Sequence, residues 1–190
     1  MKVRSSLIIV GVVITLVLAA GSIQAENDLS MDELREKLIF DVDEFRGITF
    51  IMHQRENKSV SKPGARFLPY IGHDDSSKWM FARAYYRGNG WIFMEQVYVI
   101  IDDKRYQTPK YPSYSDLVDH DIFTGGVSET IHFRWQDVEE LGRAIANASV
   151  NSEIKVRFFG DKYFDFVLTP EDIQAWKEIV YYFDNIQIGD

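Results

Sequence analysis

The 190-residue sequence contains no cysteine, which excludes disulfide bonds and zinc sites built from thiolates. With 12 Gly and 5 Pro it is also too poor in these residues for a collagen-like or low-complexity chain. Aromatic residues are abundant instead, with 13 Phe, 10 Tyr and 4 Trp. Such a chain can bury enough apolar surface to fold. The composition therefore predicts a globular protein held together by packing alone.

The N-terminus has the three parts of a secretory signal: two basic residues, an apolar run over residues 7–20, and a cleavage region over 21–25. The apolar run of about 14 residues is shorter than the roughly 20 that a membrane-spanning helix needs. We therefore expect cleavage after Ala25 and a periplasmic or secreted protein. An uncleaved N-terminal anchor is the alternative. The expected division is a signal peptide over 1–25 and a single domain over 26–190.

The charge is acidic, with 21 Lys plus Arg against 29 Asp plus Glu, a net charge of −8. Removing residues 1–25 would remove two positive charges, leaving 19 against 29, or −10. Nucleic-acid backbones and anionic lipid headgroups repel such a domain. We therefore expect no nucleic-acid partner and, after cleavage, no contact with the membrane.

Hydrophobic spacing predicts three helices. The first covers residues 31–45, because Ser30 and Glu33 fit a capping box and an apolar stripe follows them. The second begins at Asp137. The third begins at Thr169, where a hydroxyl cap is followed by proline at the first helical position.

Aromatic and β-branched runs predict strands over 48–54, 79–87, 91–101, 105–108, 129–135, 153–159 and 163–168. Gly88-Asn89-Gly90 predicts a hairpin between 79–87 and 91–101. In the last hairpin, a three-residue loop places Arg157 opposite Asp165. The polar stretches 55–78 and 109–124 are predicted to be long loops.

This order of elements predicts an α+β domain, with a mainly antiparallel sheet and about three helices packed on one face. A β-sandwich with peripheral helices is the alternative.

Two histidine-containing runs could carry chemistry, because each places an imidazole beside carboxylates on a predicted loop: His73-Asp74-Asp75 and Asp119-His120-Asp121. A serine triad can also be drawn from Ser113, Ser115 or Ser128 with His120 and Asp116. No recognised metal or nucleophile motif is present. The catalytic candidates are therefore His73, Asp116, Asp119 and His120, and we expect no metal and no cofactor.

The predicted central hairpin is rich in aromatic residues, and its candidate binding residues are Tyr85, Tyr86, Trp91, Phe93 and Tyr98. One face of the hairpin must meet the core. The other face, unless a helix covers it, is a contact surface for a peptide, a glycan or an envelope protein.

An ordered series of short segments runs through the second half of the chain: Tyr-Tyr-Arg-Gly at 85–88, Trp-Ile-Phe at 91–93, Val-Ile-Ile-Asp-Asp at 99–103 and Val-Arg-Phe-Phe-Gly at 156–160. With the C-terminal amphipathic helix, this series resembles a diffuse group of uncharacterised exported bacterial proteins and lipoproteins. The resemblance covers residues 79–185. It implies a location in the bacterial envelope, and it implies no activity or site residues.

The sequence thus favours an exported, non-enzymatic binding or accessory domain over an enzyme. The alternative is a metal-assisted or serine hydrolase built on the stretches 55–78 and 109–124.

The predicted maturation can be tested directly. Intact-mass measurement of the exported protein should give a chain that begins at Glu26. A chain beginning at Met1 in the membrane fraction would show instead that the N-terminus is an uncleaved anchor.

Overall fold

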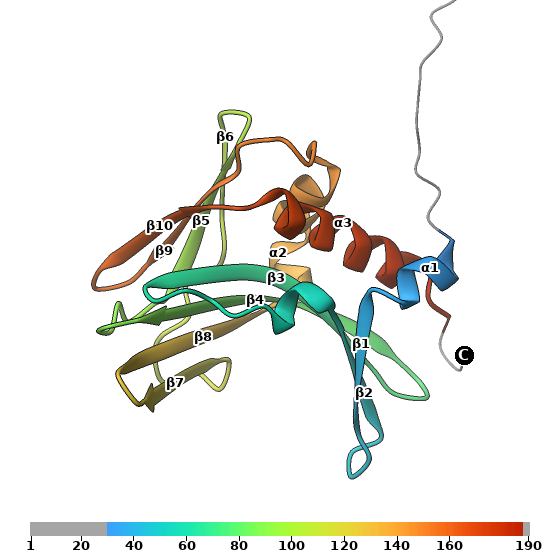
Figure 1. The fold of residues 1–190 in the computed structure, drawn as a ribbon. Coiled ribbons are helices and arrows are strands. Elements are labelled where there is room, and N and C mark those ends of the chain that lie inside the picture. The colour runs from blue at the N-terminus through green and yellow to red at the C-terminus, as the bar shows by residue number, and fades with distance from the viewer. Residues whose placement is uncertain (1–29, 188–190) are drawn as a thin grey trace, which may run out of the picture.

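The computed structural model describes residues 30–187, so the predicted signal peptide lies outside the described residues. Ten strands form two antiparallel sheets, and three α-helices and one short 3-10 helix accompany them (Figure 1). This confirms the α+β class. Within the described residues, no helix combines the length and apolar character needed to cross a membrane.

The larger sheet, here called sheet A, has the strand order β1-β2-β3-β4-β8-β7. Its strands are β1 (Leu38–Asp43), β2 (Ile48–His53), β3 (Gly64–His73), β4 (Lys78–Gly88), β7 (Val118–Phe123) and β8 (Gly126–Arg134). The smaller sheet B has the order β10-β9-β5-β6. Its strands are β5 (Gln96–Ile101), β6 (Lys104–Gln107), β9 (Lys155–Phe159) and β10 (Tyr163–Val167). The helices are α1 (Met31–Arg35), η1 (Gln54–Asn57), α2 (Trp135–Asn147) and α3 (Pro170–Asn185).

The core lies against one face of sheet A, here called its inner face. Phe67 of β3, Ala84 of β4 and Ile131 of β8 stand side by side on this face and are fully buried. Helices α2 and α3 lie together over the same face, and sheet B completes the enclosure (Figure 1). Trp176 of α3 is fully buried, and its indole Nε1 donates a hydrogen bond to the Phe67 carbonyl at 2.8 Å. This bond joins the middle of α3 to the centre of sheet A.

Several local predictions are confirmed. Helix α3 begins with Pro170, after a capping box between Thr169 and Asp172. In the β9–β10 hairpin, Phe158 pairs with Phe164 and Arg157 pairs with Asp165, as the three-residue loop requires.

The predicted helix over residues 31–45 is wrong beyond its first turn. Helix α1 ends at Arg35, and residues 38–43 form β1, which pairs with β2. The spacing of Leu34, Leu38 and Val42 fits a helix, but it also places Leu38 and Val42 on one face of a strand. Strand pairing with β2 decides between the two.

The predicted loop over 55–78 is also wrong, because it contains the ten residues of β3. Pro69 and Gly72 each have a structural role within β3. Pro69 lies one residue beyond the last β2–β3 pair, Met52–Tyr70, where β3 has a neighbour on one side only and a missing N–H is tolerated. A Cβ on Gly72 would lie 2.4 Å from the Trp79 indole, so only glycine fits there.

The predicted hairpin at Gly88-Asn89-Gly90 does not form. Strand β4 pairs with β3 and β8, whereas β5 belongs to sheet B. Residues 89–95 therefore carry the chain from one sheet to the other. The predicted loop over 109–124 likewise contains a strand, β7, which pairs with β8 along the edge of sheet A.

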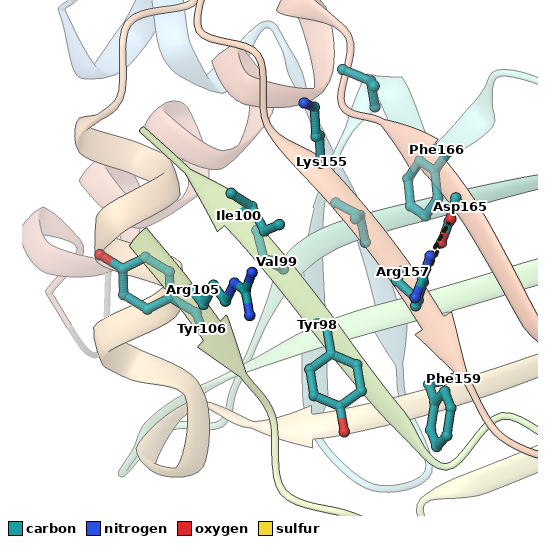
Figure 2. Close-up of a pocket in the computed structure, with 12 residues that line it drawn as sticks. Tyr98, Val99, Ile100, Arg105, Tyr106, Lys155, Arg157, Phe159, Asp165 and Phe166 are labelled. Atoms are coloured by element: carbon teal, nitrogen blue, oxygen red, sulfur yellow. Dashed lines mark hydrogen bonds and ion pairs between the residues drawn. The ribbon is translucent and has the colours of Figure 1, made fainter. Parts of the chain in front are cut away.

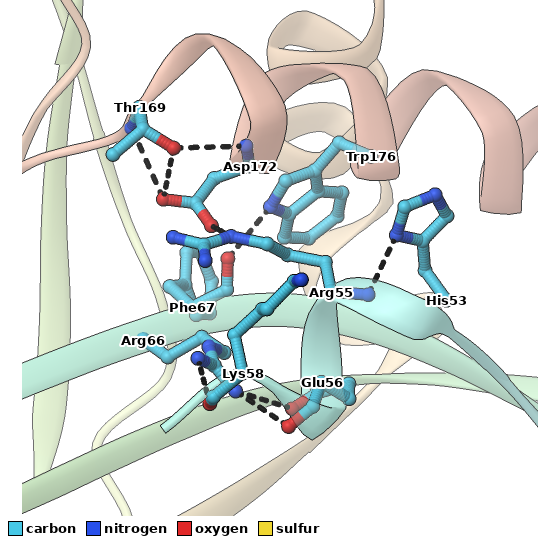
Figure 3. Close-up of polar contacts among 9 residues, drawn as sticks. All are labelled: His53, Arg55, Glu56, Lys58, Arg66, Phe67, Thr169, Asp172 and Trp176. Atoms are coloured by element: carbon cyan, nitrogen blue, oxygen red, sulfur yellow. Dashed lines mark hydrogen bonds and ion pairs between the residues drawn. The ribbon is translucent and has the colours of Figure 1, made fainter. Parts of the chain in front are cut away.

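Carboxylates of α3 attach the N-terminal segment to the core. Asp172 accepts a hydrogen bond from Arg55 Nε of η1 at 2.7 Å (Figure 3). Glu178, whose side chain is 5% exposed, accepts hydrogen bonds from Lys37 Nζ at 2.7 Å and His53 Nε2 at 2.9 Å. The His53 Nδ1 accepts the Arg55 backbone N–H, which assigns the ring proton to Nε2.

Replacement of Trp176 tests the packing of α3. We expect Trp176→Ala to lower the free energy of unfolding by about 3–5 kcal/mol, because it empties a fully buried site and leaves the Phe67 carbonyl without its donor. Trp176→Phe keeps part of the ring and should cost less. Urea titration measures both, and a loss below about 1 kcal/mol for the alanine variant would mean that α3 does not pack on sheet A.

The Glu178 contacts predict a specific dependence of stability on pH. Burial raises the pKa of Glu178, but hydrogen bonds from His53, Lys37 and Gln174 outweigh it and lower the pKa to about 2. Because the folded-state pKa lies below the unfolded value near 4.5, this contribution is complete above about pH 4.5 and is lost as the pH falls towards 2.

We therefore expect Glu178→Gln to be less stable than the wild type by about 2 kcal/mol near pH 7, a gap that closes near pH 2. Urea midpoints across this range measure it. The exposed carboxylate variant Glu153→Gln is the control and should follow the wild type. A gap that stays constant with pH would contradict the assignment.

Candidate functional site

A buried carboxylate fixes the segment that crosses between the sheets. Glu129 of β8 is 1% exposed, and its two oxygens accept the backbone N–H groups of Ile92 and Met94, each at 2.6 Å. From the other side, the Ile92 carbonyl accepts the Lys162 N–H at 3.2 Å and the Glu95 N–H donates to the Phe159 carbonyl at 2.9 Å. The crossing segment is thus held by sheet A and by the β9–β10 hairpin at once.

The two hydrogen bonds from Ile92 and Met94 to Glu129, here called the Glu129 clamp, hold an aromatic cluster at the surface. Phe93, between the two clamped amides, has φ of 50° and a side chain 42% exposed. Positive φ is unfavourable for a bulky residue, and such strain is found where surrounding contacts impose it. The Phe93 ring stacks on Trp91 at a centroid distance of 6.0 Å, and His120 meets the Trp91 ring edge-on at 5.3 Å. His120 Nε2 lies 3.8 Å from the Glu129 carboxylate.

A larger feature lies on the outer face of sheet B, the face turned away from the core. A hollow of about 740 Å³ extends across strands β6, β5, β9 and β10 (Figure 2). This volume lies within the range of small-ligand sites, roughly 300–1,000 Å³. Its apolar lining includes Tyr98, Ile100, Phe159 and Val167, and the Tyr98 and Phe159 rings meet edge-on at 5.7 Å.

The side chains that line this hollow carry a net positive charge, opposite in sign to the net charge of the whole chain. Its lining includes the cations Arg105, Lys155 and Arg157 and one carboxylate, Asp165. Arg157 donates two hydrogen bonds of 2.6 Å to Asp165, which lowers the pKa of that carboxyl. The lining therefore carries two cations in excess, on a protein of net charge −8.

The predicted binding residues are divided among several surfaces. Tyr98 lines the hollow on sheet B, and Trp91 and Phe93 form the aromatic cluster with His120. Tyr86 is 5% exposed and points into the core, where it contacts Phe164. Tyr85, its neighbour on β4, points to the opposite face of sheet A, which none of α1, α2 and α3 covers (Figure 1).

The predicted catalytic residues do not converge. His73 pairs with Lys78 at one end of β4, whereas His120 pairs with Glu129 and so aligns with Tyr86. These two β4 positions are eight residues apart, which is about 26 Å along a strand.

Among residues 30–187, no hydrogen bond or ion pair joins His120 to another hydrolase candidate. Asp119 points to the opposite face of β7 and lies 3.6 Å from His132. Asp116 is exposed in the turn before β7. Ser128 lies on the face of sheet A opposite to His120, and Ser115 accepts a hydrogen bond from the Leu117 N–H. In the described part of the chain, no three His, Asp or Glu side chains are grouped to hold a metal ion.

Sequence reasoning missed Arg105, Lys155 and Phe159 as lining residues. The alternation along 153–159 places Lys155, Arg157 and Phe159 on one outward face, and this was the available signal. The pairing of β5 with β9, whose paired residues lie 55 to 63 positions apart in the chain, had no local signal.

A scan against protein-family models, a search of curated proteins and a search of solved structures each find no match.

The Glu129 clamp predicts a large effect of a near-isosteric change. In Glu129→Gln, the amide NH₂ would face a backbone N–H, donor against donor, in a buried site. We expect a loss of about 2–3 kcal/mol in the free energy of unfolding. Glu140→Gln, at a side chain 80% exposed, is the matched control and should change stability by less than about 0.5 kcal/mol. Urea unfolding measures both, and equal small losses would contradict the clamp.

Proposed function

We propose that this protein is an exported, non-enzymatic binding domain of the bacterial envelope, and that its ligand binds in the hollow on the outer face of sheet B. The ligand is an acidic segment of a peptide or protein that also carries apolar side chains. The observation that carries the proposal is the combination of two excess cations with aromatic and aliphatic side chains in one hollow of about 740 Å³.

The sign of the charge favours an acidic ligand. The net negative charge of the protein is enough to keep it soluble. The cations Arg105 and Lys155 on this face of sheet B are therefore not needed for solubility. Lys155 contacts the exposed Glu153 at 3.2 Å, a surface pair that contributes little. It therefore stays accessible to a carboxylate of the ligand.

The apolar lining favours a ligand with hydrophobic groups between its charges. Phe159 is 40% exposed and Val167 49%, and together with Tyr98 they present apolar surface to solvent across three strands. Burial of such surface supplies affinity, and the cations supply orientation and selectivity.

A defined probe tests the proposal: a soluble decapeptide in which Glu alternates with Leu, compared with the peptide in which Lys replaces Glu. Calorimetric titration should detect the Glu peptide and not the Lys peptide. The double variant Arg105→Glu/Lys155→Glu should bind the Glu peptide about tenfold more weakly, since each exposed ionic contact contributes up to about 1 kcal/mol.

The control is Arg46→Glu/Lys58→Glu, which makes the same charge change at exposed positions outside sheet B. It should bind nearly as well as the wild type. Equal weakening in both double variants would show that only net charge matters, and absence of binding by any form would contradict an acidic ligand at this face.

A further inference from the structure

Strand β10 leaves an open edge on sheet B. It is the outermost strand of the order β10-β9-β5-β6, and within residues 30–187 no strand pairs with its other side. Its ladder with β9 has a defined phase, because Leu168 N–H bonds to Ile154 O at 3.0 Å and Gly160 N–H bonds to Lys162 O at 2.9 Å. The backbone N–H and C=O groups of the even-numbered residues of β10 therefore point to β9. Those of Tyr163, Asp165 and Val167 point to the open edge.

The other three edges carry the charges that discourage pairing with a further strand. These are Asp41 and Asp43 on β1, Lys104 and Arg105 on β6, and Asp119 and Asp121 on β7. Strand β10 has the sequence Tyr-Phe-Asp-Phe-Val, and its one charge, Asp165, is already bound by Arg157 within the same molecule. Among the four edges, β10 is the least protected.

The inner face of β10 is also incompletely covered. Phe158 of the neighbouring strand β9 is fully buried and Val156 is 2% exposed. Phe164 and Phe166, beside them on β10, are only half-buried. A further strand against β10 would cover these two rings.

We infer that β10 pairs with β10 of a second copy of this chain, in antiparallel orientation about a two-fold axis at Phe164. A two-fold arrangement suits this edge, because each copy supplies the same open strand. In this register, Tyr163 of one copy stands opposite Asp165 of the other, which separates the two Asp165 carboxylates and offers each a phenol donor. A register centred on Asp165 would place the two Asp165 carboxylates directly opposite each other, which is unfavourable for like charges.

The pairing joins the two B sheets into one sheet of eight strands and brings the two hollows onto one continuous face. It forms through only a few residues of each copy, so the dimer should be weak and dependent on concentration. This inference does not depend on the proposed ligand.

The absence of cysteine makes the register directly testable. At the two-fold axis, the Phe164 residues form a non-hydrogen-bonded pair, with Cα atoms about 4.5 Å apart, a separation that a disulfide can bridge. Phe164→Cys should therefore form a disulfide-linked dimer under mild oxidation, and Phe166→Cys should not. Equal cross-linking of both variants, or of Phe166→Cys alone, would overturn this register.

Sedimentation of the unmodified protein gives a test that does not depend on the folding of a cysteine variant. The average mass should rise towards twice the monomer mass as concentration increases. Tyr163→Pro removes an N–H that faces the open edge and should weaken association about tenfold or more, whereas Tyr163→Val keeps that N–H and should weaken it less. A monomer at all concentrations, or a dimer that Tyr163→Pro leaves unchanged, would overturn the inference.

Discussion

The arrangement of the two sheets depends on one buried carboxylate. After β4, the chain leaves sheet A and enters sheet B through a segment in which Ile92 and Met94 are buried. Glu129 of β8 accepts the backbone N–H groups of both residues. A buried charge is unfavourable unless it is fully hydrogen-bonded, so the carboxylate and the crossing segment require each other. Together with the hydrogen bonds from the β9–β10 hairpin, this contact holds Phe93 at its positive φ.

The position of sheet B follows from this contact, and separate contacts of α3 hold the other side of the molecule. Because the crossing segment is fixed, sheet B packs with one face towards the core and leaves its outer face free, with a half-buried Tyr98 and an exposed Phe159 in the hollow. On the opposite side, Trp176 and Glu178 of α3 attach the centre of sheet A and the N-terminal hairpin to the same core. Packing and buried polar contacts together thus replace the disulfides that this chain cannot form.

Local signals in the sequence were sufficient where neighbouring residues determine the structure, as in the Thr169 cap and the Arg157–Asp165 pair. They failed where distant segments decide. Taken by itself, Pro69 indicates a loop. It fits within a strand because the pairing of β2 with β3 ends at Met52–Tyr70, one residue away. Glu129 offered an unused signal, since it shares the alternation of Ile131 and Phe133 and so had to point into the core. The hollow itself could not be predicted, because it requires the long-range pairing of β5 with β9.

We propose that ligand binding takes place on the outer face of sheet B, and amide-resolved NMR tests this most directly. Titration of labelled protein with the Glu–Leu decapeptide should shift the backbone amide signals of Tyr98, Arg105 and Phe159. All three shifts should reach saturation at the same peptide concentration. Shifts confined instead to Trp91 and His120 would place the binding surface at the aromatic cluster and contradict the account.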